Sequence, residues 1–201
     1  MTSESRARTR LDPAVRRQQI AEAAARVFAE HDPSEVSFEA VAEEAGVSRS
    51  LVYSYFGDRG SLFAAAYTYE LARLDGEIDG ALEALGSNRE RLASAVSAYL
   101  EFAWRHQKEW ELIASASASR HPAVREAVIA RTEQIANSLG GTPEARLLVR
   151  GVIGMLEAAA VHTLERDEVA PDELADLLTQ VIWAGVSSLQ DESEGTSPNN
   201  P

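Results

Sequence analysis

Residues 37–63, SFEAVAEEAGVSRSLVYSYFGDRGSLF, decide the fold of this chain. The first half of the stretch is acidic and apolar, whereas the second half carries arginine, serine and tyrosine. Ser37 and Ser48 are both good N-caps, because a serine hydroxyl can accept a hydrogen bond from a free amide in the first turn of a helix. Gly46 lies in the short turn between two helices, and such a turn fixes them at a steep angle. The stretch therefore predicts one helix that packs and a second that faces a partner outside the molecule.

The second of these helices has two different faces. Val52 and Phe56 are four residues apart and share a side of the helix, so we expect them to anchor it to the core. The residues that point away from the core or lie at the edge of that face are Arg49, Ser50, Leu51 and Ser54. Small side chains let a helix approach the DNA major groove, while leucine can touch a thymine methyl and arginine a guanine edge. This pattern predicts a helix that reads DNA bases.

Helical periodicity dominates the remainder of the chain, and nothing alternates at period two over a useful length. The predicted fold class is therefore all-α, with about nine helices. Outside the opening stretch, helices are predicted at 13–30, from about 62 to 85, and at 88–105, 107–119, 123–139, 143–166 and 172–189. The predicted organisation is a flexible basic arm, a helix-turn-helix domain, a helical effector-binding and dimerisation domain and a disordered tail, over residues 1–12, 13–60, 61–189 and 190–201.

Composition limits the class of protein. With 201 residues and 45% hydrophobic content, the chain can bury a sizeable core. It has no cysteine, which excludes disulfides and thiolate metal sites. The sequence contains neither a membrane-spanning apolar run nor a signal-peptide pattern. We therefore expect a soluble, cytoplasmic protein with no membrane partner.

The net charge of −13 opposes DNA binding in total but not in its distribution. The first 75 residues contain nine arginines and twelve acidic residues, so most of the excess acidity lies further along the chain. Five of these arginines lie within the first 20 residues. A basic arm at the N-terminus is compatible with phosphate contact, and a solvated, disordered tail is the alternative.

Together these motifs resemble the tetracycline-repressor (TetR) family of bacterial regulators, over about residues 15–64. The family pattern is a turn, an aliphatic–Tyr pair, an aromatic–Phe pair and a basic residue, present here as Ala45-Gly46-Val47-Ser48, Val52-Tyr53, Tyr55-Phe56 and Arg59. The resemblance implies that bases are contacted by Arg49, Ser50, Leu51 and Ser54. It implies that phosphates are held by Ser37, Ser48, Tyr53, Tyr55 and Arg59.

Plainer interpretations exist for several of these residues. Tyr53 also fits a core aromatic whose hydroxyl reaches the surface. Arg59 also fits a solvated residue at a helix start, and capping alone accounts for Ser37 and Ser48. Asp32 stands where the family usually has glycine and is followed by proline, so we expect the turn after the first helix to differ from the family's.

The last two predicted helices carry more apolar and small residues than one protomer needs to bury. This breadth suggests a partner, and the resemblance implies a four-helix bundle with a second copy of the chain. A homodimer would place two recognition helices on a palindromic site. The expected interface residues are Leu147, Gly151, Gly154, Ala158, Leu178, Val181, Ile182 and Gly185. An ordinary monomer core is the alternative.

By the same resemblance, the middle helices hold a small-molecule effector. The candidate residues are Tyr99, Phe102, Trp104, His106, Trp110, Ile113, Met155 and His162. The aromatic residues among them also fit an ordinary core, since helical spacing alone produces such stripes. The two histidines also fit the surface.

Enzyme chemistry is not indicated. The sequence has no glycine-rich phosphate loop, its four histidines lack metal-ligand spacing, and no cofactor is implied. The predicted function is a transcriptional regulator, chiefly a repressor, that binds a palindromic double-stranded DNA operator as a homodimer and is released by a small-molecule effector. Two alternatives stay open: a small-molecule-binding protein whose helix-turn-helix is only structural, and a DNA-organising protein without an effector.

Overall fold

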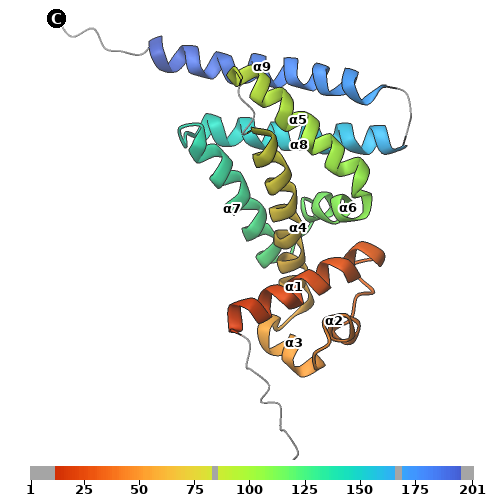
Figure 1. Cartoon of the computed structure of the whole chain (residues 1–201). Helices are drawn as coiled ribbons and strands as arrows, with labels where there is room; N and C mark the ends of the chain where they lie inside the picture. Colours follow the sequence, from red (N-terminus) through yellow and green to blue (C-terminus); the bar gives the residue numbers. More distant parts are fainter. Residues whose placement is uncertain (1–11, 83–85, 166–168, 196–201) are drawn as a thin grey trace, which may run out of the picture.

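The computed structural model describes residues 12–82, 86–165 and 169–195, and over these ranges the chain forms nine α-helices and no strand. The predicted all-α class is therefore confirmed. The first three helices form the lower end of the molecule in Figure 1, and the later helices form the part above them. In chain order the helices are α1 (Pro13–Glu30), α2 (Phe38–Ala45), α3 (Arg49–Phe56), α4 (Arg59–Leu82), α5 (Asn88–Arg105), α6 (Gln107–Ala116), α7 (Pro122–Ser138), α8 (Pro143–Glu165) and α9 (Pro171–Gly195).

Capping side chains set several helix starts. The carboxylate of Asp12 accepts a hydrogen bond from the Ala14 amide at 2.8 Å, with proline at the first position of α1. α5 starts with a capping box, in which the Ser87 hydroxyl and the Glu90 carboxylate each accept a hydrogen bond from the other residue's amide. These local signals are why the predicted helix starts agree closely with the structure.

α4 joins the lower and upper parts through one continuous core. Leu62, Ala66 and Leu74 along this helix are buried, and α4 packs against α1 below and against α5, α6 and α7 above (Figure 1). The rings of Phe28 and Phe63 meet edge to face at 5.1 Å, which ties α1 to the first turns of α4. The DNA-reading part predicted from the sequence therefore shares a core with the rest of the chain.

Two predicted boundaries are wrong. α9 continues to Gly195, so residues 190–195 are helical and not part of a disordered tail. No proline interrupts the chain between Pro171 and Gly195, and polar residues at a helix end are compatible with a solvated helix. α6 ends at Ala116 and not at residue 119, because the chain turns there toward Pro122. The predicted arm at 1–11 and the tail at 196–201 lie outside the described residues.

Candidate nucleic-acid interface

The turn between α2 and α3 has the geometry that the sequence predicts. Gly46 has φ of 64° and ψ of 35°, the left-handed conformation that glycine adopts without steric cost. The next amide, that of Val47, donates to the Ala42 carbonyl at 2.9 Å and closes the end of α2. The hydroxyls of Ser37 and Ser48 accept hydrogen bonds from the Ala40 and Leu51 amides, at 3.1 and 3.3 Å. Both helices are therefore capped, and their relative angle is fixed.

α3 is anchored to the rest of the domain from two sides. Val52 and Phe56 are buried, as predicted. From α1, the Arg17 guanidinium donates to the Tyr55 carbonyl at 2.8 Å and lies 4.5 Å from the centre of the Phe56 ring. Gln19 donates to the Ala45 carbonyl at the end of α2, at 3.2 Å. The sequence did not identify these two residues, because nothing in the pattern of α1 distinguishes them from other surface polar residues.

The outer face of α3 is polar and accessible. Arg49, Ser50, Tyr53 and Ser54 are exposed, and Leu51 is partly buried. Tyr53 is 62% exposed, and its ring lies 5.8 Å from the ring of Phe38 at the start of α2. The interpretation of Tyr53 as a core aromatic is therefore wrong, because a neighbouring ring supports it on one side while its hydroxyl end remains outside.

Among the described residues, Arg49 has no strong partner. Its Nε lies 4.0 Å from a carboxylate oxygen of Glu39, and the two side chains are 70% and 75% exposed. An exposed ion pair at this distance contributes little free energy and is screened by salt. The guanidinium is therefore available to another acceptor.

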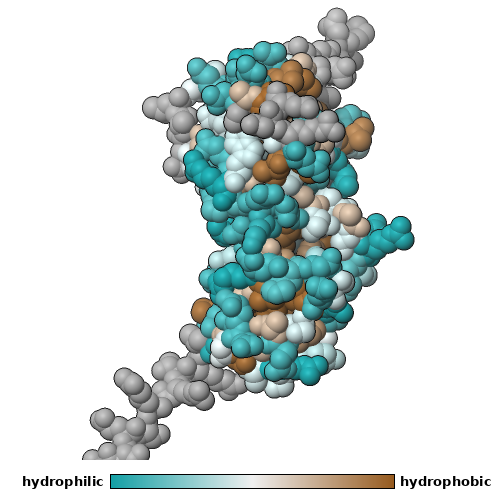
Figure 2. All heavy atoms as spheres, turned by 90° about the vertical axis from the view of Figure 1, so that its right-hand side faces the viewer, coloured by the Kyte–Doolittle hydropathy of each residue, from teal (hydrophilic) through white to brown (hydrophobic). Residues whose placement is uncertain are grey.

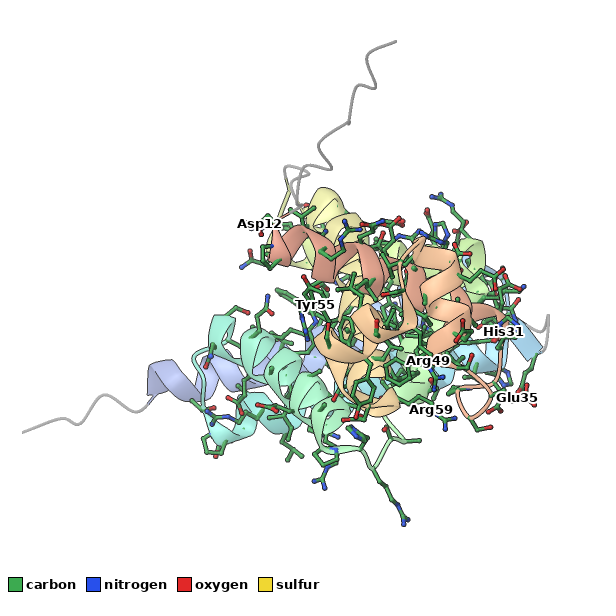
Figure 3. The ribbon with its side chains drawn as sticks, turned by 90° about the horizontal axis from the view of Figure 1, so that it is seen from below. Asp12, His31, Glu35, Arg49, Tyr55 and Arg59 are labelled. Carbon is green, nitrogen blue, oxygen red and sulfur yellow. The ribbon has the colours of Figure 1, made fainter. Side chains whose placement is uncertain are left out.

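The residues that flank α3 lie on the same lower side of the molecule. Viewed from below, Arg49, Tyr55 and Arg59 are all visible on this surface (Figure 3). Tyr55 is partly buried, whereas Arg59 is exposed and donates to the Ser34 carbonyl. Asp58 caps α4 by accepting a hydrogen bond from the Ser61 amide at 2.8 Å, and this bond holds the pKa of the Asp58 carboxyl below its ordinary value.

The turn after α1 is built around Asp32. The Asp32 carboxylate accepts hydrogen bonds from the amide and the hydroxyl of Ser34, at 2.7 and 2.5 Å. These bonds hold the pKa of Asp32 below its ordinary value and close the turn without a glycine. In the α1–α2 turn, hydrogen bonds to an aspartate side chain thus stabilise the turn, whereas a glycine would allow it through its wider range of backbone angles.

Comparison with known proteins agrees with this geometry. Residues 20–66 match the family model described as bacterial regulatory proteins, tetR family, and residues 88–185 match the tetracyclin repressor-like C-terminal domain. The chain belongs to the tetR family. Members of this family are DNA-binding transcriptional regulators, and the stretch that matches the regulatory-protein model, residues 20–66, contains α2 and α3.

Relatives of the tetR-family chain are named as transcriptional regulators. The HTH-type transcriptional activator FasR of Mycolicibacterium smegmatis is 25% identical over 182 residues, which cover 86% of this chain and 83% of FasR. The HTH-type transcriptional regulator HbdR of Aromatoleum sp. is 37% identical over 84 residues, which cover 42% of this chain and 37% of HbdR.

Solved structures of tetR-family regulators have the same fold. One from Streptomyces coelicolor superposes with a TM-score of 0.66 at 28% identity and covers 92% of this chain and 87% of its own. A TetR-like regulator from Rhodococcus sp. RHA1 gives a TM-score of 0.62 at 29% identity, with 89% and 99% covered.

The two last helices expose an apolar face. On α8, Leu147 is 76% exposed, and Gly151, Gly154 and Ala158 continue the same stripe toward Val161. α8 is long and apolar enough to cross a membrane, by length and composition alone. Only 11% of its apolar stretch is buried within the protomer. In Figure 2, brown apolar residues lie at the height of α8 and α9 and also lower in the view, whereas teal covers most of the remaining surface.

The predicted partner face of α9 needs correction. Leu178 and Ile182 are 5% and 3% exposed and belong to the core of the protomer. A Cβ at Gly185 would lie 3.4 Å from Leu148 Cδ1, so this residue faces α8 of the same chain. Among the α9 side chains that the structure describes, the large apolar ones left outside are Leu177 and Val181, at 55% and 51% exposed. Their i, i+4 spacing was a signal in the sequence, but it could not show which side of α9 faces inward.

The predicted effector residues do not gather around one described hollow. Tyr99, Phe102, Trp110 and Ile113 are buried in the core, and the Trp110 indole donates to the Tyr99 hydroxyl at 3.0 Å. The remaining four are partly buried or exposed: Trp104, His106, Met155 and His162. His106 Nε2 lies 3.6 Å from the Glu77 carboxylate. None of the eight lines either of the two hollows found among the described residues.

Titratable groups inside the helical domain have shifted pKa values. Burial raises the pKa of Tyr67 to about 12 and also raises the pKa of Glu157 on α8. Glu157 accepts a hydrogen bond from the Ser117 hydroxyl at 2.9 Å. Clusters of shifted titratable groups occur often at functional sites, so this part of the helical domain is a candidate site.

Proposed function

We propose that this regulator binds a palindromic operator as a homodimer and that a small-molecule effector changes its affinity for the operator. Under this proposal, Arg49, Ser50, Leu51 and Ser54 contact bases. Phosphates are held by Ser37, Ser48, Tyr53, Tyr55 and Arg59. The observation that carries the proposal is the exposed polar face of α3, held at a fixed angle by a capped turn. Its place of action is the cytoplasm, where bacterial DNA lies.

The exposed face of α8 and α9 supports the homodimer. α8 and α9 contact each other, and the protomer leaves exposed both Leu147 with its glycine-rich stripe on α8 and the Leu177 and Val181 side chains on α9. Contiguous apolar surface of this kind is typical of an interface between subunits. A symmetric copy would cover the same residues on both chains and pair two α3 helices across one duplex.

The effector site is proposed among α5, α6 and α8. Tyr99 and Trp110 supply aromatic surface there, and Glu157 with its Ser117 partner supplies a polar anchor. An apolar site with a few polar anchors is the usual chemistry for binding a small molecule. Since Tyr99 and Trp110 are packed together in this structure, an effector would bind a state in which these helices separate. Its preference for that state would oppose DNA binding.

Repression follows most simply from this scheme, because a dimer that occupies a promoter excludes other proteins. A second candidate is activation, and the observation that favours it is the name of FasR, a transcriptional activator that matches most of the chain. A reporter gene behind the selected operator distinguishes the two: expression rises on deletion of a repressor and falls on deletion of an activator.

The decisive experiment selects duplexes from a random pool and measures binding by fluorescence anisotropy at several salt concentrations. For Arg49→Ala we expect a loss of about 1–3 kcal/mol in specific binding and a relaxed preference at one base position, with non-specific binding retained. Arg105→Ala is the matched control, because Arg105 is an exposed arginine on α5 paired with Glu101. An unchanged base preference in Arg49→Ala means that the reading residues are misassigned. Absence of salt-sensitive binding to any duplex removes the regulator proposal.

A further inference from the structure

A hollow of about 370 Å³ lies where the DNA-binding domain meets the helical domain. Its apolar walls come from three elements: Phe28 at the end of α1, Phe63 on α4 and Val124 on α7, all buried. Its polar rim includes Ser34 in the α1–α2 turn, Arg59 at the start of α4 and Ser115 on α6. Segments far apart in the sequence thus build one site, and it is separate from the proposed effector site.

His121, at the start of α7, contacts the start of α4 next to the hollow. The His121 ring packs so closely on Gly60 that a Cβ there would lie 2.2 Å from the ring. On its other side, His121 Nε2 lies 3.1 Å from the Asp58 carboxylate, which caps α4. The first turn of α4 is therefore in direct contact with α7. Anything that occupies the hollow touches both domains.

Arg59 gives the hollow its charge preference. A guanidinium carries five N–H donors. The bond to the Ser34 carbonyl uses one nitrogen, and the side chain remains exposed. A planar guanidinium beside apolar walls suits a carboxylate on an aromatic body, because the carboxylate forms two parallel hydrogen bonds while the rings stack on phenylalanine. The volume is near the lower end of the usual range for small-molecule sites, which favours a compact ligand.

We propose that this hollow binds a small aromatic carboxylic acid and that such a ligand weakens DNA binding. The carboxylate binds Arg59, while the aromatic body lies against the wall that Phe28 and Phe63 form together. The regulatory consequence rests on the proposed function, in which Arg59 holds a DNA phosphate. Carboxylate and phosphate then compete for one guanidinium, and the coupling is reciprocal: DNA weakens ligand binding as much as the ligand weakens DNA binding.

The test uses 2-naphthoate as the probe and uncharged 2-naphthamide as its matched compound, with binding to the full chain measured by calorimetry. We expect naphthoate to bind about tenfold or more tightly than naphthamide, because only naphthoate pairs with Arg59. We expect Arg59→Met to abolish this preference. Equal binding of the two compounds, or no binding of naphthoate at millimolar concentration, overturns the proposal.

Location is tested with Ser115→Trp, which places an indole in the hollow from an exposed position on α6. We expect it to abolish naphthoate binding while thermal unfolding and DNA affinity stay unchanged. Ser97→Trp is the matched control, because Ser97 lines the other hollow, between α4 and α5. Naphthoate binding that survives Ser115→Trp in a folded protein overturns the assignment.

DNA affinity with and without naphthoate separates this proposal from the regulator proposal. If Ser115→Trp removes naphthoate binding but the protein binds no duplex, the ligand site is supported and the proposal of a DNA-binding regulator is overturned. If the protein binds DNA specifically and saturating naphthoate does not change the affinity, the regulator proposal is supported and the coupling between ligand and DNA binding is overturned.

Discussion

Single buried carboxyls in the helical domain differ in how their charge is compensated. Glu70 pairs with Arg73 at 2.7 Å, and Asp75 pairs with Arg131. Among the described residues Glu157 has no such ion pair, and the Ser117 hydroxyl is its hydrogen-bond donor. Burial is the first cause of the raised pKa of Glu157, because a desolvated carboxylate is unfavourable. The charged form of Glu157 therefore costs the folded state free energy.

This cost predicts a pH-dependent effect of Glu157→Gln. A folded-state pKa above the unfolded value stabilises the protein at low pH, and that contribution is lost as pH rises through the folded-state pKa. The wild-type chain should therefore lose stability relative to the glutamine variant as pH rises from below 4.5, the ordinary pKa of the carboxyl, through its raised folded-state pKa. Thermal unfolding in acid and at neutral pH measures the difference in stability, which should be larger at neutral pH.

The control for this prediction is Glu165→Gln, since Glu165 is an exposed glutamate at the end of the same helix. Its melting temperature should follow that of the wild type at every pH. A difference between Glu157→Gln and wild type that does not change with pH would show that desolvation of Glu157 is not the cause.

At the scale of elements, α3 depends on α1 for its position. The Arg17 guanidinium contacts the last turn of α3 twice, through the Tyr55 carbonyl and through the Phe56 ring. A recognition helix of eight residues has few contacts of its own, so losses at this junction affect the whole element. The junction lies on the side of α3 opposite to its exposed residues.

We therefore predict that Arg17→Ala destabilises the protein by about 1–2 kcal/mol, through the lost hydrogen bond and cation–π contact. Operator affinity should fall as well, although Arg17 is not among the residues proposed to read bases. Urea unfolding and anisotropy titration measure the two effects. Gln18→Ala is the control, because Gln18 is an exposed polar residue on the same helix and should change stability by less than about 0.5 kcal/mol. Equal effects of the two substitutions contradict the prediction.

Much of the helical architecture could be predicted from the sequence, because helix starts depend on local chemistry. Ser37, Gly46 and Ser48 act through amides and carbonyls only a few residues away, and they mark the ends of α2 and α3 correctly. The inner face of α9 could not be predicted in the same way. Leu177 and Leu178 are adjacent and equally apolar, and only packing against distant helices decides which one is buried.

The candidate site, too, could be predicted from the sequence only where local chemistry or helical spacing decides it. The exposed face of α3 could be predicted, because Val52 and Phe56 fix the opposite face by helical spacing. The hollow near Arg59 could not, because three stretches of the chain build it, residues 28–34, 59–63 and 115–124, and tens of residues separate each from the next. Gly60 was the one available signal: a glycine inside a helix start indicates close approach of another element, but not which element approaches.

At the scale of the whole molecule, the exposed stripe on α8 predicts that the protomer is not the stable form. A glutamate in place of Leu147 would put a charge into the proposed interface, where its desolvation is not compensated. For Leu147→Glu we expect monomers in sedimentation velocity at concentrations where the wild type is dimeric, and a loss of affinity for the full palindrome. Binding to a single half-site should change little.

Leu139→Glu is the matched control, because Leu139 is also an exposed leucine but lies at the end of α7, outside the stripe. It should remain dimeric. A monomeric wild type, or a dimeric Leu147→Glu, would show that α8 and α9 are not the subunit contact.

The continuity of α4 has a mechanical consequence. With 24 residues the helix is about 36 Å long, and its first turn supports α3 while its upper turns pack among α5, α6 and α7. The two ends of this one helix therefore lie in different domains, and a tilt at one end moves the other. A tilt of only about 5° displaces its far end by about 3 Å, which approaches the length of one base-pair step. In the proposed dimer, a small rearrangement around its upper turns would therefore change the spacing of the two α3 helices relative to the two halves of an operator.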